Sequence, residues 1–184
     1  GSQGSAALNA LVEGWVARGL PRGVGVIWGT GRDHFQRHAS RASAQVIVRP
    51  YLAPIADAYA CADLAIARAG AMTTAELCAW GIPMYLVPLP TAAADHQTAN
   101  ARALADAGAA RWVSQREATA EQLAMIVSEV MGDASLRERW GAAASARGRP
   151  DAAARIAARL DALLGPHAST PAEPATGARA TAST

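Results

Sequence analysis

Lysine is absent from this sequence of 184 residues, and its positive charge is carried by arginine. Lys and Arg total 17 against 15 acidic residues, so the formal net charge is only +2, and the arginines are scattered along the chain. A strong or clustered basic field is what nucleic-acid binding requires. The composition therefore excludes a nucleic acid as the expected partner. The excess of arginine and alanine is attributed to the compositional bias of the source.

Cysteine is also scarce, and the patterns that bind metals are missing. Cys61 and Cys78 are the only cysteines, without CxxC spacing or a nearby cluster of ligands, which argues against a zinc site. Both lie in apolar sequence, so we expect free, buried thiols in a reducing compartment. An Asp-x-Asp pair, which would suggest a metal-held diphosphate, is absent as well. No metal or other cofactor is expected.

Long apolar runs are missing too. None approaches the roughly 20 residues of a transmembrane helix, and the start has no signal-peptide pattern. We expect a soluble chain, which leaves peripheral docking on a membrane surface open. The length favours about one domain.

Apolar runs typical of strands alternate along the sequence with segments of helical periodicity. This alternation predicts a parallel sheet flanked by helices, of the α/β class. Strands are expected at Val24–Trp28, Gln45–Val48, Asp63–Ala67, Met84–Val87 and Ala110–Val113. Continuous rather than alternating apolar runs are typical of parallel strands covered on both faces. Helices are expected at Ile55–Cys61, Gln97–Ala107, Ala118–Met131, Leu136–Ala146 and Ala152–Leu164. A polar stretch that ends near Ala42 is also expected to be helical, and two further helices are described below with the turns that precede them. The Pro-, Ala-, Ser- and Thr-rich segment 165–184 is expected to be disordered.

The sequence opens on a glycine turn, GSQG, that leads directly into a helical pattern with Leu8, Leu11, Val12 and Trp15 on one face. Such a turn normally follows a strand. We therefore expect a fragment that begins inside its first βα turn, with the first strand missing. The alternative is a flexible start in which the pair of glycines occurs by chance.

The segment Ala67–Asn100 predicts a strand, a turn at Gly70, a helix that opens at Ala71–Thr74, a second strand and a polar loop. The first N–H groups of a helix have no intrahelical partner, and with the helix dipole they suit a phosphate or diphosphate. Glu76, about one turn further on, suits the hydroxyls of a ribose. The alternative is an ordinary βαβ unit in which Gly70 only caps a turn.

Several sequence blocks occur together in an order that is specific to one family. They are GSQG, then RPYLAPIADAYACADLAIARAGAMTTAEL, then GIPMYLVPLPTAAADHQTANARAL. This combination resembles the carboxyl-terminal half of the MurG family, the peptidoglycan GlcNAc transferases of the GT-B group. The resemblance covers about residues 1–164. It implies the Rossmann-like, donor-binding half of a GT-B fold over residues 1–164, followed by the tail at 165–184.

The resemblance also implies a set of substrate-binding residues for UDP-GlcNAc. Ser2 would contact the diphosphate, and backbone N–H groups at the start of the predicted helix would bind it as well. Glu76 would bind the ribose, the backbone of Leu52 would bind uracil, and Gln97 would bind the GlcNAc ring. The full set is Ser2, Leu52, Ala71, Met72, Thr73, Thr74, Ala75, Glu76 and Gln97, with Gly70, Asp95 and Asn100 in support.

The function implied by the resemblance is part of an inverting transfer of GlcNAc from UDP-GlcNAc to undecaprenyl-diphospho-muramoyl-pentapeptide, which converts lipid I to lipid II in peptidoglycan synthesis. In this family the catalytic base, the acceptor site and the membrane contact belong to the amino-terminal domain. We therefore expect no catalytic residue in this chain, no activity of the chain alone, and action at the cytoplasmic face of the bacterial inner membrane. Two alternatives are a non-catalytic UDP-GlcNAc-binding subunit with a separate membrane partner, and a related GT-B lipid glycosyltransferase.

Three positions near the predicted site depart from the family or stay ambiguous. Ala69 stands where the family often has serine, so one hydroxyl is lost. His96 stands where some relatives have glutamine, and either helps to bind the sugar or is an ordinary loop histidine. Arg68 either faces the donor phosphates or covers the end of its strand.

Overall fold

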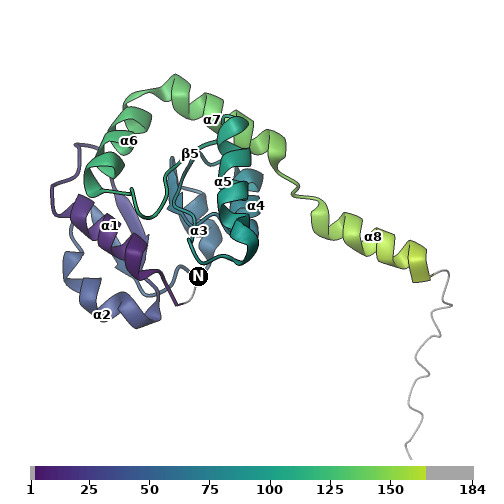
Figure 1. The fold of residues 1–184 in the computed structure, drawn as a ribbon, viewed down its shortest axis with the longest axis horizontal. Helices are drawn as coiled ribbons and strands as arrows, with labels where there is room; N and C mark the ends of the chain where they lie inside the picture. The colour runs from purple at the N-terminus through teal and green to yellow at the C-terminus, as the bar shows by residue number, and fades with distance from the viewer. Residues whose placement is uncertain (1–2, 165–184) are drawn as a thin grey trace, which may run out of the picture. The chain divides into compact units, whose positions relative to one another are not determined.

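The computed structural model describes residues 3–164, so Ser2 and the segment 165–184 lie outside the described residues (Figure 1). The chain divides into two compact units, Gly1–Arg149 and Pro150–Thr184, which are described separately. The predicted domain boundary between residues 164 and 165 stays a prediction.

Short parallel strands form two sheets in the first unit. In one sheet β1 (Val26–Gly29) pairs with β2 (Val46–Arg49). In the other, β4 (Met84–Leu86) lies between β3 (Ala65–Ala67) and β5 (Ala110–Trp112). The predicted strands and their parallel direction are confirmed, but across residues 3–164 no strand connects β1 to β3.

The helices lie close to their predicted positions. They are α1 (Ala6–Val16), α2 (Phe35–His38), α3 (Ile55–Tyr59), α4 (Ala71–Trp80), α5 (His96–Asp106), α6 (Ala120–Gly132), α7 (Ala134–Arg147) and α8 (Ala152–Leu164), with short 3₁₀ turns at Arg32–His34, Ala39–Arg41 and Ala93–Asp95. The polar stretch predicted as helical up to Ala42 contains only the four residues of α2 between two 3₁₀ turns. At α6 the N-cap residue Thr119 forms a capping box with Gln122.

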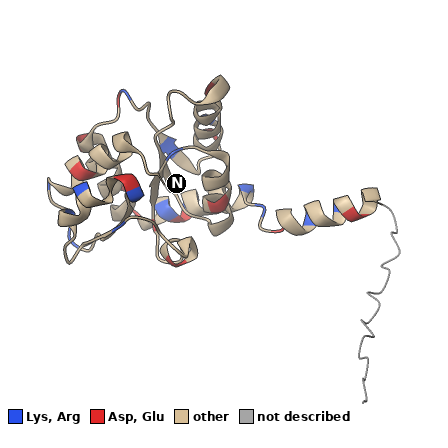
Figure 2. Cartoon of the chain, turned by 90° about the horizontal axis from the view of Figure 1, so that it is seen from below, with Lys and Arg blue, Asp and Glu red and all other residues tan. Residues whose placement is uncertain are grey.

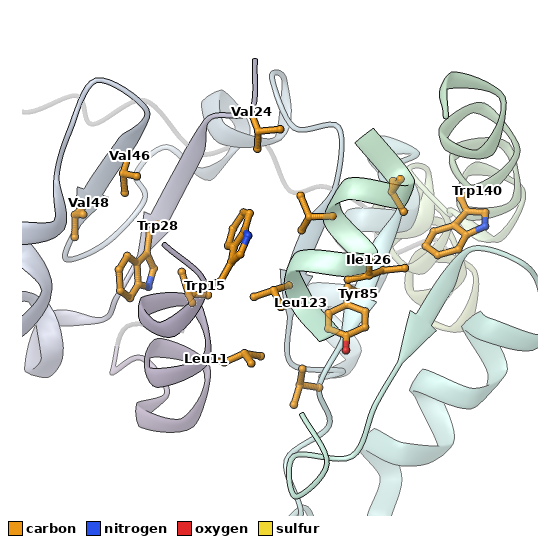
Figure 3. Packing of buried hydrophobic residues seen from close by; sticks show 14 residues of the cluster. Leu11, Trp15, Val24, Trp28, Val46, Val48, Tyr85, Leu123, Ile126 and Trp140 are labelled. Atoms are coloured by element: carbon orange, nitrogen blue, oxygen red, sulfur yellow. The ribbon is translucent and has the colours of Figure 1, made fainter. Parts of the chain in front are cut away.

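Two apolar cores cover the two faces of the second sheet. The first is built from α1 and α6 and also covers β1 and β2 (Figure 3). Figure 3 shows Leu11 and Trp15 on α1 and Leu123 and Ile126 on α6 within this core. The second core contains residues of α4, α5 and α7 together with β4, whose three residues are all buried. Helices therefore cover both faces of a parallel sheet, as the sequence predicts.

The start of α1 is fixed against the end of β1 by a close backbone approach. Gly4 has φ +78°, and a Cβ atom there would lie 2.0 Å from the carbonyl oxygen of Thr30. The buried side chain of Asn9 donates to the same carbonyl oxygen at 2.8 Å and accepts from the Trp28 indole N–H at 3.0 Å. Gly4 is therefore required by the geometry of this turn rather than present by chance.

The expectation that both thiols are buried is wrong for one of them. Both cysteines are free, but only Cys78 is buried, and Cys61 is exposed. The reason is that α3 ends at Tyr59 and Cys61 lies in the turn behind it, where its thiol contacts the carbonyl oxygen of Asp57 at 3.3 Å. Trp80, at the end of α4, is 49% exposed, and its ring centroid lies 6.0 Å from that of Tyr59.

The described part of the second unit is α8. Its apolar residues Ile156, Leu160, Leu163 and Leu164 are all exposed, and Asp151 pairs with Arg155 one turn later. Across residues 3–164 no helix is both long and apolar enough to cross a membrane.

The buried His38 predicts a pH dependence of stability. Burial lowers its pKa below the ordinary value of 6.5, and the nearby Arg37 and His34 act in the same direction, whereas Glu13, at 3.6 Å from Nδ1, opposes the shift. Because the unfolded chain then binds this proton at a higher pH than the folded chain, the free energy of unfolding should fall as the pH decreases through 6.5. The contribution of one proton is at most about 1.4 kcal/mol per pH unit.

Urea unfolding between pH 5 and 8 measures this effect. His38→Gln should flatten the decline below pH 6.5, whereas His96→Gln, at an exposed position, should leave it unchanged. An equally steep decline in the His38 variant would contradict the assignment.

Candidate functional site

The start of α4 presents unpaired backbone donors. Gly70 is the N-cap residue, with φ −68° and ψ 144°, and no side chain caps the helix. The first intrahelical bond runs from the Thr74 N–H to the Gly70 carbonyl oxygen at 3.0 Å, so the N–H groups of Ala71, Met72 and Thr73 precede the hydrogen-bonded part of the helix. A Cβ atom built on Gly70 would meet nothing within 4 Å. The position beside Gly70 is therefore open, and the N–H groups that follow it lack a side-chain cap, as an anion site requires.

Thr74 contributes to the site through the shape of this turn. Its hydroxyl lies 3.0 Å from the Gly70 carbonyl oxygen and 3.1 Å from that of Ala71, and the residue is buried. Its N–H and its hydroxyl are therefore both engaged within the chain. The following Ala75 lies on the exposed side of the helix.

Glu76 is held by a residue that the sequence analysis missed. The hydroxyl of Tyr59, at the end of α3, donates to Oε2 of the exposed Glu76 at 2.9 Å. Burial, together with the hydrogen bond to the Glu76 carboxylate and its negative charge, raises the pKa of Tyr59 to about 12. The phenol is therefore a neutral donor at any physiological pH, and it fixes one carboxylate oxygen. The sequence contains no spacing signal for this pair, because its members are 17 residues apart on different helices.

The predicted polar loop lies at the same edge of the sheet as the start of α4. Asn100 donates from Nδ2 to the carbonyl oxygen of Ala69 at 3.0 Å, which ties the first turns of α5 to the residue before Gly70. Gln97 accepts from the Leu89 N–H at 3.1 Å through Oε1, which leaves its amide N–H groups available as donors. Asp95 accepts from the Thr98 hydroxyl at 2.6 Å. At His96, Nδ1 lies 2.7 Å from the Ala93 carbonyl oxygen, as in a local turn contact.

The side chain of Arg68 covers the strand ends, which decides between its two predicted roles. Its guanidinium donates to the carbonyl oxygens of Val87 and Pro88, at 2.9 and 3.0 Å. It also donates to the Ser5 hydroxyl at 2.9 Å and to Oε1 of Gln115 at 2.6 Å. Burial lowers the pKa of Arg68. Arg68 bonds Ser5 at the start of α1, and α4 begins three residues after Arg68 in the sequence. The starts of the two helices therefore lie near the same end of β3.

Of the two remaining predicted site residues, the structure describes Leu52 but not Ser2. Leu52 follows β2 and is half-buried, and a Cβ atom on Gly29 would lie 3.1 Å from its Cγ. Ser2 lies outside the described residues. Among the residues that the structure describes, no group of three or more His, Cys, Asp or Glu side chains could hold a metal ion. Charged residues of both signs are spread over many elements rather than gathered on one (Figure 2).

A parallel α/β domain with an open helix N-terminus and a held carboxylate at the carboxyl ends of its strands has the features of a nucleotide-binding domain. Residues 1–156 match the family model described as glycosyltransferase family 28 C-terminal domain. The chain belongs to this family, which confirms the resemblance stated from the sequence.

Two similar curated proteins share the name UDP-N-acetylglucosamine–N-acetylmuramyl-(pentapeptide) pyrophosphoryl-undecaprenol N-acetylglucosamine transferase. The protein from Sorangium cellulosum is 44% identical over 169 residues, which cover 87% of this chain and 41% of the relative. The protein from Salinibacter ruber is 40% identical over 166 residues, covering 89% of this chain and 45% of the relative. The chain thus spans less than half the length of these relatives.

Solved structures agree with the fold. The crystal structure of Acinetobacter baumannii MurG matches with a TM-score of 0.77 and 32% identity, over 87% of this chain and 47% of that one. The glycosyltransferase VinC matches with a TM-score of 0.64 at 15% identity, over 88% of this chain and 41% of that one, which shows a shared fold. The predicted fold, a parallel sheet flanked by helices as in one half of a GT-B glycosyltransferase, is therefore confirmed.

The bonds of Arg68 predict a loss of stability in Arg68→Met. The substitution keeps an apolar stem but leaves the Val87 and Pro88 carbonyl oxygens without this donor, so unfolding should require about 1–3 kcal/mol less free energy. Chemical denaturation measures the change, and Arg139→Met, at an exposed position on α7, is the matched control. Equal stability of the two variants would show that Arg68 does not hold the strand ends together.

Proposed function

We propose that this chain binds UDP-GlcNAc at the carboxyl ends of its parallel strands. In this proposal it is the donor-binding part of the transferase that moves GlcNAc to undecaprenyl-diphospho-muramoyl-pentapeptide in peptidoglycan synthesis. The names of the curated relatives support this donor and this acceptor. The observation that carries the proposal is the start of α4, where three N–H groups have no intrahelical partner and no side chain caps them.

These donors match the chemistry of the leaving group. As the bond between GlcNAc and UDP breaks, negative charge grows on the diphosphate. Fixed N–H dipoles at a helix N-terminus stabilise that charge without reorganising, so they act more strongly on the transition state than on the bound donor. The backbone N–H groups of Ala71, Met72 and Thr73 take this role, and the loss of one such donor typically costs about 10²–10³ in rate.

The rest of the donor is assigned to the neighbouring polar groups. Glu76 accepts from the ribose hydroxyls while Tyr59 holds its second oxygen in place. The backbone at Leu52 meets uracil. The free amide N–H groups of Gln97 bind the GlcNAc ring, and Asp95 and Asn100 support the loop from behind.

The acceptor and the membrane belong to the proposal as well. We assign the catalytic base, the lipid-linked acceptor and the membrane contact to an amino-terminal domain, and the site of action to the cytoplasmic face of the bacterial inner membrane. The chain spans less than half of its curated relatives, which is compatible with this division. On this account the chain alone binds donor and transfers no sugar.

Calorimetric titration with UDP-GlcNAc and UDP tests the proposal. Glu76→Ala should weaken the binding of both by about 1–3 kcal/mol, or roughly 5- to 150-fold in Kd, because a charged hydrogen bond to ribose is lost. Glu138→Ala, at an exposed position on α7, should bind like the wild type. Failure of the folded wild-type chain to bind any uridine nucleotide would contradict the proposed site.

Tyr59→Phe separates the positioning of Glu76 from direct contact with the nucleotide. The variant keeps the ring that packs 6.0 Å from Trp80 but loses the donor to Glu76. UDP should bind about 2- to 10-fold more weakly, because the carboxylate loses one orienting bond. With 2′,3′-dideoxy-UDP, which lacks both ribose hydroxyls, wild type and variant should bind alike. A loss of equal size with both nucleotides would assign Tyr59 to another role.

A further inference from the structure

A buried tryptophan and a buried asparagine form a polar pair inside the first core. Trp28 on β1 and Asn9 on α1 are only 5% and 3% exposed. The indole N–H of Trp28 donates to Oδ1 of Asn9 at 3.0 Å, and Nδ2 of Asn9 donates to the Thr30 carbonyl oxygen at 2.8 Å. Buried polar groups are costly unless they are paired, and each of these four groups has a partner. The pair therefore fixes the position of α1 against the end of β1.

The two bonds allow only one orientation of the Asn9 amide. An indole N–H can only donate and a carbonyl oxygen can only accept, so Oδ1 must face Trp28 and Nδ2 must face Thr30. Trp28 itself has little freedom to move. Its backbone pairs with Val48 in the ladder between β1 and β2, and its ring centroid lies 4.9 Å from that of the buried His38. The indole is thus a fixed donor that orients the amide.

The carbonyl oxygen that Asn9 holds belongs to a tight contact between two glycine turns. A Cβ atom on Gly4 would lie 2.0 Å from the Thr30 oxygen, and a Cβ atom on Gly31 would lie 2.3 Å from the backbone nitrogen of Gly4. Both glycines have a positive φ, of +78° and +84°. Contact between backbones sets how closely the turns can approach, but it has no direction. The bond from Asn9 to Thr30 is directional, and it holds the two turns together.

The Gly4 turn lies at the same end of the sheet as the start of α4. Ser5, the residue after Gly4, accepts from the guanidinium of Arg68 at 2.9 Å through its hydroxyl oxygen. The helix α4 begins at Ala71, three residues after Arg68. A displacement of the Gly4 turn would therefore change the surroundings of a diphosphate bound at the first N–H groups of α4.

We propose that Trp28 is a positioning residue of the donor site. Its indole N–H orients the amide of Asn9, the amide holds the Thr30 carbonyl oxygen, and this bond keeps the Gly4 turn in place beside the diphosphate. Trp28 acts through Asn9 and does not touch the nucleotide. The inference rests on the proposed function, because it concerns the binding of the same nucleotide.

Titration of the full 184-residue chain with UDP tests this role in Trp28→Phe. The variant keeps an aromatic ring in the core but loses the donor to Asn9, so the amide can pivot about its one remaining bond. UDP should bind about 2- to 10-fold more weakly. Trp15→Phe is the matched control, because it removes the same volume from the same core and leaves the bond between Trp28 and Asn9 intact (Figure 3).

Urea denaturation of the two variants measures the loss of stability that follows from the smaller ring alone. Trp15→Phe should bind UDP like the wild type even where it loses as much stability as Trp28→Phe. Equal Kd values in wild type and Trp28→Phe, or an equal weakening in both variants, would overturn the positioning role and leave the proposed function intact. Failure of the folded wild-type chain to bind UDP would instead contradict the proposed function, and this inference with it.

A measurement on the wild-type chain replaces the titration if Trp28→Phe does not fold. The indole ¹⁵N–H signals of Trp15 and Trp28 are followed while UDP is added. Coupling between two sites is reciprocal, so the signal of Trp28 should shift with the same Kd as the backbone amide of Ala71, whereas the signal of Trp15 should stay in place. A Trp28 signal that UDP leaves unmoved would overturn the proposal.

Discussion

The guanidinium of Arg68 is the interaction on which the site edge depends. It joins the Ser5 hydroxyl at the start of α1, the end of β4 and Gln115 in the segment before α6. These segments are far apart in sequence, and Arg68 contacts all three. A planar group with five donors can satisfy several acceptors at fixed angles, which lysine cannot. The start of α1 and the strand end that leads to Gly70 are thereby held next to each other.

From this arrangement the chemistry of the edge follows. Gly70, the last residue between β3 and α4, is the N-cap residue and has no side chain that could cap the helix. The helix α4 therefore begins with three unpaired N–H groups. The nearby polar side chains are themselves restrained: Asn100 by Ala69, Gln97 by Leu89, and Glu76 by Tyr59. A site whose donors and acceptors are fixed before the ligand arrives loses less entropy on binding, and it can stabilise developing charge without rearranging.

Much of the fold could be predicted from the sequence, because local signals and tertiary packing agree. The parallel strands and the start of α4 both followed from residue pattern. Two features could not be predicted because they depend on contacts distant in sequence: the pair Tyr59–Glu76 and the direction of Arg68. The exposure of Cys61 depends on the residue at which the short helix α3 ends, and the sequence pattern does not fix that residue. The polar stretch near α2 failed as one helix because no continuous apolar stripe holds it together.

The central claim is that the first N–H groups of α4 bind the diphosphate of a uridine nucleotide. The most direct measurement is a titration of the ¹⁵N-labelled chain with UDP, followed by amide chemical shifts. The account predicts that the largest changes occur at Ala71, Met72 and Thr73, and that uridine without phosphate leaves these three amides nearly unchanged. Saturable changes confined to other parts of the chain, with these amides unmoved by UDP, would contradict it.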